Sequence, residues 1–283
     1  SDLYGHGRGV KKPAIVVLEG AFHGRTLATL SATGNRKIQV GFEPLVTGFV
    51  RAPRNDVEAL RQIAANNPDV VAFLAEPIQG ESGVQVLEPG YLHAARQICT
   101  EQGWLFMLDE VQTGNGRTGS YFAYQGLELT PDVVTTAKGL GNGVTIGACM
   151  ARGAAAQVLG AGQHGSTFGG NPLVCAAGLA VVTTIVQDNL CANATAMGQL
   201  IAETLRADST LATKITEIRG KGLMLGIELH TDCGELVQRG LDAGLLINVT
   251  AGNTVRLLPP LVISEQESRD LACGVAELIR DFD

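Results

Sequence analysis

The feature of this sequence that most constrains the fold is the stretch 103–114, which reads GWLFMLDEVQTG. Residues 104–108 are continuously apolar, and the run ends abruptly in Asp109 and Glu110, with Gln112 close behind. A short apolar run bounded by turn signals is typical of a strand that is buried on both faces. In open α/β sheets, ligands bind outside the carboxyl ends of such strands. A buried strand followed by a solvated loop would give the same pattern, so other residues must decide between the two.

The composition indicates a large folded protein and argues against several classes. The chain has 283 residues, 45% of them hydrophobic and 17% charged, which is enough for a large core and two domains. Its net charge of -7 argues against a nucleic-acid partner. The longest apolar stretch, 173–186, is too short and too mixed to span a bilayer, so we expect no membrane. The six cysteines form no Cys-x-x-Cys pair and the histidines have no metal-ligand spacing, which favours reduced thiols in the cytoplasm and no metal site.

Strand-like and helix-like segments alternate along the first part of the chain, and this alternation predicts parallel strands with helical crossovers. The predicted strands are 14–18, 70–75, 104–108, 131–137 and 146–151. The predicted helices are 26–33, 56–66, 89–102 and 154–159, with Asp56 as the N-cap of the second and Gly103 as the end of the third. We therefore expect an α/β fold in which helices flank a mainly parallel sheet.

The pattern changes after residue 172. Residues 173–206 are alanine-rich and helical, with a break near Asp188. A smaller α+β unit follows, with predicted strands 223–229, 245–249 and 255–258 and predicted helices 233–243 and 264–280. Ser264 and Glu267 match a capping box at the start of the last helix. We therefore predict a large domain over residues 1–187 and a small domain over residues 188–283.

A lysine directly after the predicted strand 131–137 is the second informative feature. Lys138 would be an ordinary snorkelling side chain if its amine reached water. Partial burial would lower the pKa of such a lysine and free its amine to attack a carbonyl, forming a Schiff base. Asp109 could then face a cationic ring nitrogen and keep it protonated. A Schiff-base lysine with an aspartate partner for a pyridinium is what pyridoxal phosphate (PLP) chemistry requires.

Six segments carry a resemblance to a known family, in order and over nearly the whole chain. They read FHGRT (22–26), EPIQGE (76–81), LDEVQTG (108–114), GRTG (116–119), AKGLG (137–141) and HGSTFGGNP (164–172). Together they resemble the class III (subgroup II) PLP-dependent aminotransferases, and the HGST segment narrows the resemblance to the members that act on acetylornithine and ornithine. The resemblance implies the type I PLP-dependent transferase fold, PLP as the cofactor, and a homodimer with active sites at the subunit interface.

The resemblance also implies contacts of individual residues with the cofactor. Lys138 matches the lysine that forms the Schiff base and shuttles a proton, and Asp109 matches the partner of the pyridinium nitrogen. Gln112 approaches the phenolic oxygen of the ring. Phe22 stacks on one ring face, and His23 lines the site.

Phosphate and substrate contacts follow from the same resemblance. Ser166 and Thr167 are expected to reach the cofactor phosphate of the neighbouring subunit. Arg25 is expected to bind a substrate carboxylate, and Arg256 the α-carboxylate of glutamate, since a guanidinium binds carboxylates in bidentate geometry. Glu81 is expected to pair with Arg256 when the amino donor is bound, and a substrate carboxylate displaces it. Taken singly, each of these residues could also be part of an ordinary turn or a surface charge.

The implied reaction transfers the δ-amino group of N-acetylornithine to 2-oxoglutarate, in the cytoplasm, as a step of arginine biosynthesis. Two alternatives stay open. One is another ω-aminotransferase of the class, acting on ornithine, succinylornithine, succinyl-diaminopimelate or 4-aminobutyrate. The other is a remnant that keeps the fold without the catalytic activity.

The sequence departs from the family pattern in several places. Asn115 stands where methionine is frequent, and Asn142 interrupts a glycine run that Val144 and Thr145 follow in place of a common proline. We expect the turn to survive, since asparagine adopts left-handed backbone angles. The N-terminal part of the family's chain is absent, and with it the loop that cradles the cofactor phosphate.

Overall fold

The computed structural model describes residues 1–282, and the chain divides into two compact units. Unit 1 comprises residues 1–77, 87–112 and 124–181. Unit 2 comprises residues 78–86, 113–123 and 182–283. The predicted division at residue 188 left 78–86 and 113–123 in the first domain, whereas both segments cluster with unit 2. The contacts of such short segments, rather than their place in the chain, decide which unit they belong to.

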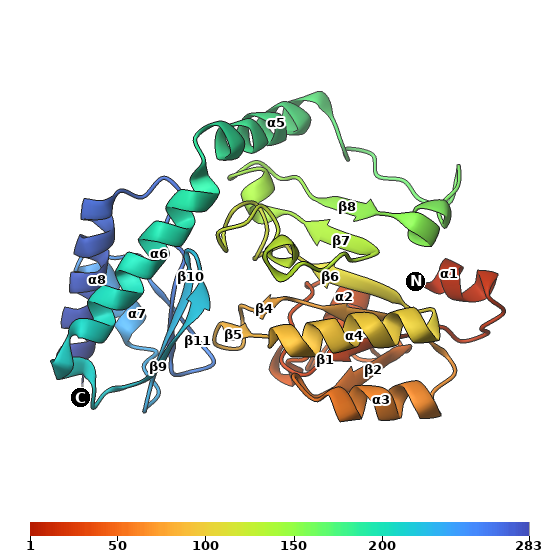
Figure 1. Cartoon of the computed structure of the whole chain (residues 1–283), viewed down its shortest axis with the longest axis horizontal. Coiled ribbons are helices and arrows are strands. Elements are labelled where there is room, and N and C mark those ends of the chain that lie inside the picture. The colour runs from red at the N-terminus through yellow and green to blue at the C-terminus, as the bar shows by residue number, and fades with distance from the viewer. Residues whose placement is uncertain (283) are drawn as a thin grey trace. The chain divides into compact units, whose positions relative to one another are not determined.

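Unit 1 is built on a six-stranded sheet with the strand order β2-β1-β3-β6-β7-β8 (Figure 1). Its strands are β1 (Ala14–Leu18), β2 (Phe49–Ala52), β3 (Val70–Ala75), β6 (Leu105–Asp109), β7 (Val133–Thr136) and β8 (Ala148–Ala151). All neighbouring strands are parallel except β8, which runs antiparallel to β7. The predicted α/β fold with a mainly parallel sheet is confirmed. The sequence did not predict β2, because a short edge strand with one buried residue gives no apolar run.

Helices pack against this sheet around a continuous apolar core. The helices are α1 (Asp2–Gly7), α2 (Leu27–Ala32), α3 (Val57–Asn66) and α4 (Pro89–Gln102), with 3-10 turns η1 (Arg36–Ile38), η3 (Lys138–Leu140) and η4 (Gly153–Gln157). As predicted, Asp56 caps α3 by accepting a hydrogen bond from Ala59 N at 2.8 Å, and α4 ends at Gly103 with φ of 66°. The core centres on Phe73 and Phe106, whose stacked rings lie 5.8 Å apart.

Unit 2 contains a four-stranded antiparallel sheet with the order β11-β12-β10-β9. Its elements are β9 (Ile215–Lys221), β10 (Met224–Leu229), β11 (Asn248–Thr250), β12 (Thr254–Leu257), α6 (Leu190–Ala207), α7 (Leu236–Asp242), α8 (Glu265–Arg280), η5 (Ser209–Leu211) and the two-stranded hairpin β4 (Ile78–Gln79) with β5 (Gln85–Val86). Helices α6 and α8 lie side by side (Figure 1). The predicted capping box of Ser264 and Glu267 is present at the start of α8. The predicted smaller α+β unit is confirmed.

Two elements contain residues of both units, η2 (Ala123–Leu127) and α5 (Pro172–Gln187). Much of the stretch 138–181 in unit 1 is exposed in spite of its apolar side chains. All four residues of β8 are exposed, and Phe168 and Leu173 are 80% and 74% exposed. Within residues 1–282, no single helix is long and apolar enough to cross a membrane, although the bent pair of α5 and α6 meets that requirement of length and composition together.

Candidate functional site

Asp109 is the last residue of β6, and its carboxylate is held through both oxygens. Oδ2 lies 2.8 Å from Nδ1 of His23. Oδ1 accepts hydrogen bonds from the Thr135 hydroxyl and from Val111 N, each at 3.2 Å. Thr135 pairs with Asp109 in the register of β7 and β6, so the sheet itself brings the hydroxyl to the carboxylate. Asp109 is only 8% exposed, and its charge is therefore fixed in direction at the carboxyl edge of the sheet.

His23 supports Asp109 from the loop that follows β1. Its backbone N donates to the Thr33 hydroxyl at 3.0 Å, and its side chain is 2% exposed. An ionised carboxylate only accepts hydrogen bonds, so Nδ1 is the donor toward Asp109. The other ring nitrogen, Nε2, is buried and has no hydrogen-bond partner within residues 1–282. A buried polar atom without a partner costs roughly 1–3 kcal/mol, which favours a polar ligand atom beside it.

Phe22, next to His23, is fixed through its backbone. Its N donates to a carboxylate oxygen of Glu76 at 2.7 Å, and Glu76 follows the end of β3. The Phe22 ring is half-buried, and the guanidinium carbon of Arg25 lies 5.7 Å from the ring centroid. Arg25 itself is exposed. The side chains of Glu76 and Thr33 thus hold two consecutive amides, which sets where the ring and the imidazole point.

An arginine of β2 supports Thr33 in turn. Arg51 on β2 donates to the carbonyl oxygens of Ser31, Ala32 and Thr33, at 2.7, 3.1 and 2.8 Å. These carbonyls lie at the end of α2, where helical carbonyls lack partners within the helix. Burial, followed by the nearby charge of Arg36, lowers the pKa of Arg51. Sequence reasoning missed both Arg51 and Thr33, since neither lies in a recognisable motif.

Lys138 lies beyond the end of β7 and begins the turn η3 with φ of 41°. Lys138 is exposed, so the condition of partial burial is not met in this chain. Asn142, at the departure from the family pattern, has φ of 45°, which confirms the expected left-handed turn. Gln112, in the turn after β6, is half-buried.

Ser166 and Thr167 lie in the exposed stretch that precedes α5. The Ser166 hydroxyl accepts a hydrogen bond from Gly169 N at 3.2 Å, which closes a turn within the stretch itself. The Thr167 side chain is exposed. Both hydroxyls therefore lie on the surface of unit 1, whereas Asp109 and His23 are shielded from water.

Glu81 and Arg256 are in contact within unit 2. Nη1 of Arg256 lies 2.8 Å from a Glu81 carboxylate oxygen and also donates to the Gly80 carbonyl at 3.1 Å. The Arg256 side chain is 8% exposed and that of Glu81 is 36% exposed. Arg256 is therefore held in place by a carboxylate that water can reach.

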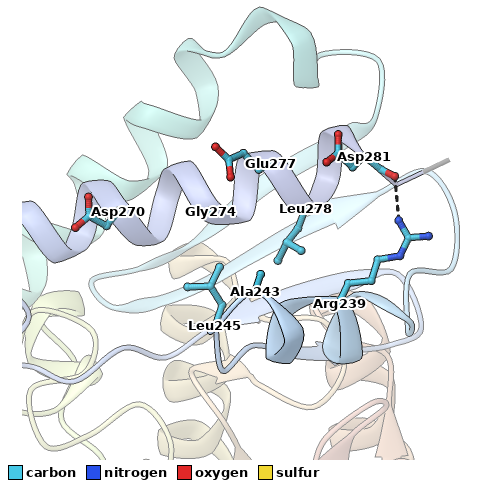
Figure 2. Close-up of a pocket in the computed structure, with 8 residues that line it drawn as sticks. All are labelled: Arg239, Ala243, Leu245, Asp270, Gly274, Glu277, Leu278 and Asp281. Atoms are coloured by element: carbon cyan, nitrogen blue, oxygen red, sulfur yellow. Dashed lines mark hydrogen bonds between the residues drawn. The ribbon is translucent and has the colours of Figure 1, made fainter.

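Two hollows lie apart from the predicted site residues. One, of about 430 Å³, lies between α7 and α8, and Figure 2 shows the residues that line it: Arg239, Ala243, Leu245, Asp270, Gly274, Glu277, Leu278 and Asp281. Arg239 donates there to the Asp281 carbonyl at 2.9 Å. The other, of about 570 Å³, is apolar and is lined in part by β1, β6, β7 and β8. Neither hollow contains a predicted cofactor or substrate residue.

Comparison with known proteins decides the family. The family profile of the class-III aminotransferases matches residues 3–279. The chain belongs to this family. It is accordingly a PLP-dependent aminotransferase, and one related structure is described with partial occupancy of PLP at its active site.

Several relatives are similar over almost all of this chain. It is 51% identical over 280 residues to acetylornithine aminotransferase of Nitrosomonas europaea. The aligned region covers 99% of this chain and 71% of that protein. It is 48% identical over 279 residues to acetylornithine aminotransferase 1 of Bordetella bronchiseptica, with the same coverage of 99% and 71%. Both relatives are named as acetylornithine aminotransferases.

Solved structures share the fold. The ornithine aminotransferase of Toxoplasma gondii superposes with a TM-score of 0.92 at 33% identity, covering 98% of this chain and 68% of that one. The acetylornithine aminotransferase of Elizabethkingia anophelis gives a TM-score of 0.85 at 34% identity, covering 99% of this chain and 72% of that one. The predicted type I transferase fold is therefore confirmed, and the chain is shorter than these relatives.

The residues at the carboxyl edge of the unit 1 sheet fit a pyridoxal phosphate ring. Asp109 presents a fixed, nearly buried carboxylate of the kind a pyridinium N–H requires. The buried, unpartnered Nε2 of His23 suits a site that receives a polar molecule. Phe22 offers a half-buried aromatic face, and Lys138 is an exposed residue with a primary amine. The donor and acceptor chemistry of this edge is thus compatible with the cofactor of the family.

Proposed function

We propose that this class-III aminotransferase transfers the δ-amino group of N2-acetylornithine to 2-oxoglutarate, giving N-acetylglutamate semialdehyde and glutamate. The activity would serve arginine biosynthesis. The observation that carries the proposal is the 2.8 Å contact between Arg256 and Glu81. Glutamate carries one more carboxylate than acetylornithine. An enzyme that uses both therefore needs a cation that is neutralised when acetylornithine is bound and available when glutamate is bound. The names of the relatives that share about half of this sequence support the same substrate.

The proposal assigns cofactor contacts to the residues of unit 1. When bound, PLP supplies an electron-withdrawing ring and a carbonyl that accepts the amino group. Lys138 would provide the amine that holds the cofactor and would carry a proton at Nζ. Asp109, with His23 behind it, would keep the ring nitrogen protonated. Phe22 would cover one ring face, and Gln112 would donate to the phenolic oxygen.

Substrate recognition falls to the arginines. Arg256 would bind the α-carboxylate of glutamate or 2-oxoglutarate after Glu81 swings away. With acetylornithine as donor, Glu81 would stay on Arg256 and cancel its charge. Arg25 would bind the carboxylate that acetylornithine retains, and its exposure leaves the guanidinium accessible.

We also propose a homodimer in the cytoplasm. Ser166 and Thr167 would then reach the cofactor phosphate of the partner subunit, since hydroxyls beside glycines suit phosphate binding. The exposed apolar side chains of the stretch 138–181 support an interface on unit 1. We expect the six cysteines to be reduced thiols in that compartment. Residues 1–187 would form the PLP-binding domain and 188–283 the small domain, with the segments 78–86 and 113–123 counted with the latter.

Half-reactions test the proposal directly. The PLP form of the whole protein is mixed separately with acetylornithine, ornithine and 4-aminobutyrate, and the loss of the cofactor absorbance is followed by stopped flow. Acetylornithine should give the largest second-order rate constant of the three amines. The reverse half-reaction should proceed with 2-oxoglutarate. A clear preference for ornithine, the substrate named for the Toxoplasma gondii relative, would replace acetylornithine in the proposal.

A further inference from the structure

Two arginines and one glycine form a single cross-strand row in the sheet of unit 2. Gly226 on β10 pairs with Arg256 on β12 and with Arg219 on β9. Directly paired residues of neighbouring strands point to the same face of a sheet. Arg219 and Arg256 therefore project on the same side, one on each flank of a residue without a side chain.

The loop 80–84, which joins β4 to β5, lies on this row and contacts both arginines. Arg256 binds its first half, through the Gly80 carbonyl at 3.1 Å and the Glu81 carboxylate at 2.8 Å. Arg219 binds its second half, since Nε and Nη2 donate to the Gly83 carbonyl at 2.9 and 2.6 Å. Arg219 is thus hydrogen-bonded to the backbone of the loop that contains Glu81.

Between the arginines, Val84 inserts into the niche above Gly226. Val84 is fully buried and packs with Ile78 and Met224. A side-chain carbon on Gly226 would lie 2.9 Å from Cβ of Val84, so only glycine leaves room. Val84 has φ of 52°, a conformation that is costly for a β-branched residue and persists only where its surroundings enforce it. The loop is therefore held in a strained shape by contacts on both sides.

Arg219 is itself fixed, so it can act as an anchor. Its side chain is 9% exposed, and Nη1 pairs with Glu217 at 2.8 Å and with Glu228. Glu228 is on β10, next to the row, and it also accepts a hydrogen bond from Asn253. The guanidinium is therefore tied to the sheet through Nη1 and holds the loop through Nε and Nη2.

We propose that Arg219 is a positioning residue for substrate exchange: it clamps the loop 80–84 through the Gly83 carbonyl so that Glu81 moves on and off Arg256 as a side chain, without displacement of the loop. This inference rests on the proposed function, in which Glu81 covers Arg256 for one substrate only. Without the clamp, Glu81 spends less time on Arg256. The acetylornithine half-reaction then loses the neutralised arginine it needs, whereas glutamate brings its own carboxylate.

The test compares both half-reactions in Arg219→Met and in wild type. The ratio of kcat/KM for acetylornithine to kcat/KM for glutamate should fall about tenfold, as expected for the loss of charged hydrogen bonds. The same substitution in a Glu81→Gln background should leave the ratio unchanged, since no charge remains to be positioned. Equal losses in both half-reactions, repeated in the Glu81→Gln background, would reduce Arg219 to a structural residue and overturn the proposal.

Hydrogen exchange provides a readout that does not depend on turnover. In Arg219→Met, amides of the segment 78–86 should exchange faster, with the unit 1 sheet unchanged. Unchanged exchange in this segment overturns the clamp. If Arg219→Met does not fold, Arg219→Lys serves, because lysine keeps the charge near Glu228 but cannot supply the paired donors to Gly83. Arg269→Met, which removes an exposed helix ion pair, is the matched control.

The failure of the proposed function is distinguishable from the failure of this inference. If Glu81→Gln alone leaves the ratio of kcat/KM for acetylornithine to kcat/KM for glutamate unchanged, Glu81 does not control substrate binding at Arg256. The proposed neutralisation of Arg256 by Glu81 is then wrong. In that case, faster amide hydrogen exchange of residues 78–86 in Arg219→Met would still show that Arg219 holds the loop. The role of Arg219 in substrate exchange would be overturned.

Discussion

Nδ1 of His23 lies 2.8 Å from Oδ2 of Asp109, although 86 positions separate the two residues. Their side chains are 2% and 10% exposed, so the contact is shielded from water. The imidazole fixes one carboxylate oxygen, and Thr135 with Val111 fixes the other. The direction of the negative charge at the sheet edge is therefore set by three partners before any cofactor binds.

His23→Ala should weaken PLP binding about tenfold, because Asp109 loses a hydrogen bond to a charged group and can rotate. The dissociation constant is measured by absorbance titration of the protein freed of cofactor. His93→Ala is the matched control, since His93 is exposed on α4. Equal affinity of the His23 and His93 variants would contradict a positioning role.

Asp109→Asn should lower kcat by about 100-fold or more, since the amide keeps the shape but not the charge that stabilises a protonated ring nitrogen. Thr135 and Val111 can still donate to the remaining carbonyl oxygen, so the fold should hold. Steady-state transamination and circular dichroism together check this. A variant that retains most of its kcat would show that the carboxylate charge is not needed.

Lys138→Ala should abolish the Schiff-base absorbance of the bound cofactor and the transamination activity, because its amine is the proposed attachment point. Lys12→Ala removes another exposed lysine and should leave both unchanged. Spectra of the two variants after incubation with PLP and gel filtration make the comparison. Retention of the absorbance band in Lys138→Ala would require another lysine.

Gly226→Ala should destabilise the protein by about 1–3 kcal/mol, because its new carbon meets Val84 at 2.9 Å. Gly234→Ala is the control, since a carbon there meets no atom within 4 Å. The free energy of unfolding is measured in denaturant. If the two substitutions have equal effects, Val84 does not occupy the niche as described.

Glu228 gives a prediction about pH. The hydrogen bond from Arg219, opposed by partial burial, holds the pKa of Glu228 below its ordinary value of 4.5. A carboxyl group whose pKa is lowered by folding stabilises the protein above its unfolded pKa, and that stability is lost as the pH falls through the folded pKa. In Glu228→Gln, the free energy of unfolding should therefore fall less between about pH 5 and about pH 3 than in wild type. Glu265→Gln, at an exposed helix pair, should keep the wild-type slope.

Local signals in the sequence were sufficient for much of the fold. Asp56, Gly103 and the capping box at Ser264 each act within a few residues of themselves, and all three are found as predicted. The edge strands β2 and β9 were missed, because neither has a continuous apolar run. The sequence could not decide whether Lys138 is buried, because its exposure depends on which segments pack around it in the folded chain.

The sequence by itself determined the central strand that ends in Asp109, the alternation that makes a parallel sheet, and the motifs that mark the family. These properties follow from residue types at short spacing. It offered no role for Glu110, which is fully buried and accepts a hydrogen bond from Tyr124 N at 2.9 Å. Only the tertiary structure decided that His23 holds Asp109 and that Arg219 holds Gly83. Those contacts join residues 86 and 136 positions apart, and no local pattern encodes a hydrogen bond whose partners meet only after the sheets have formed.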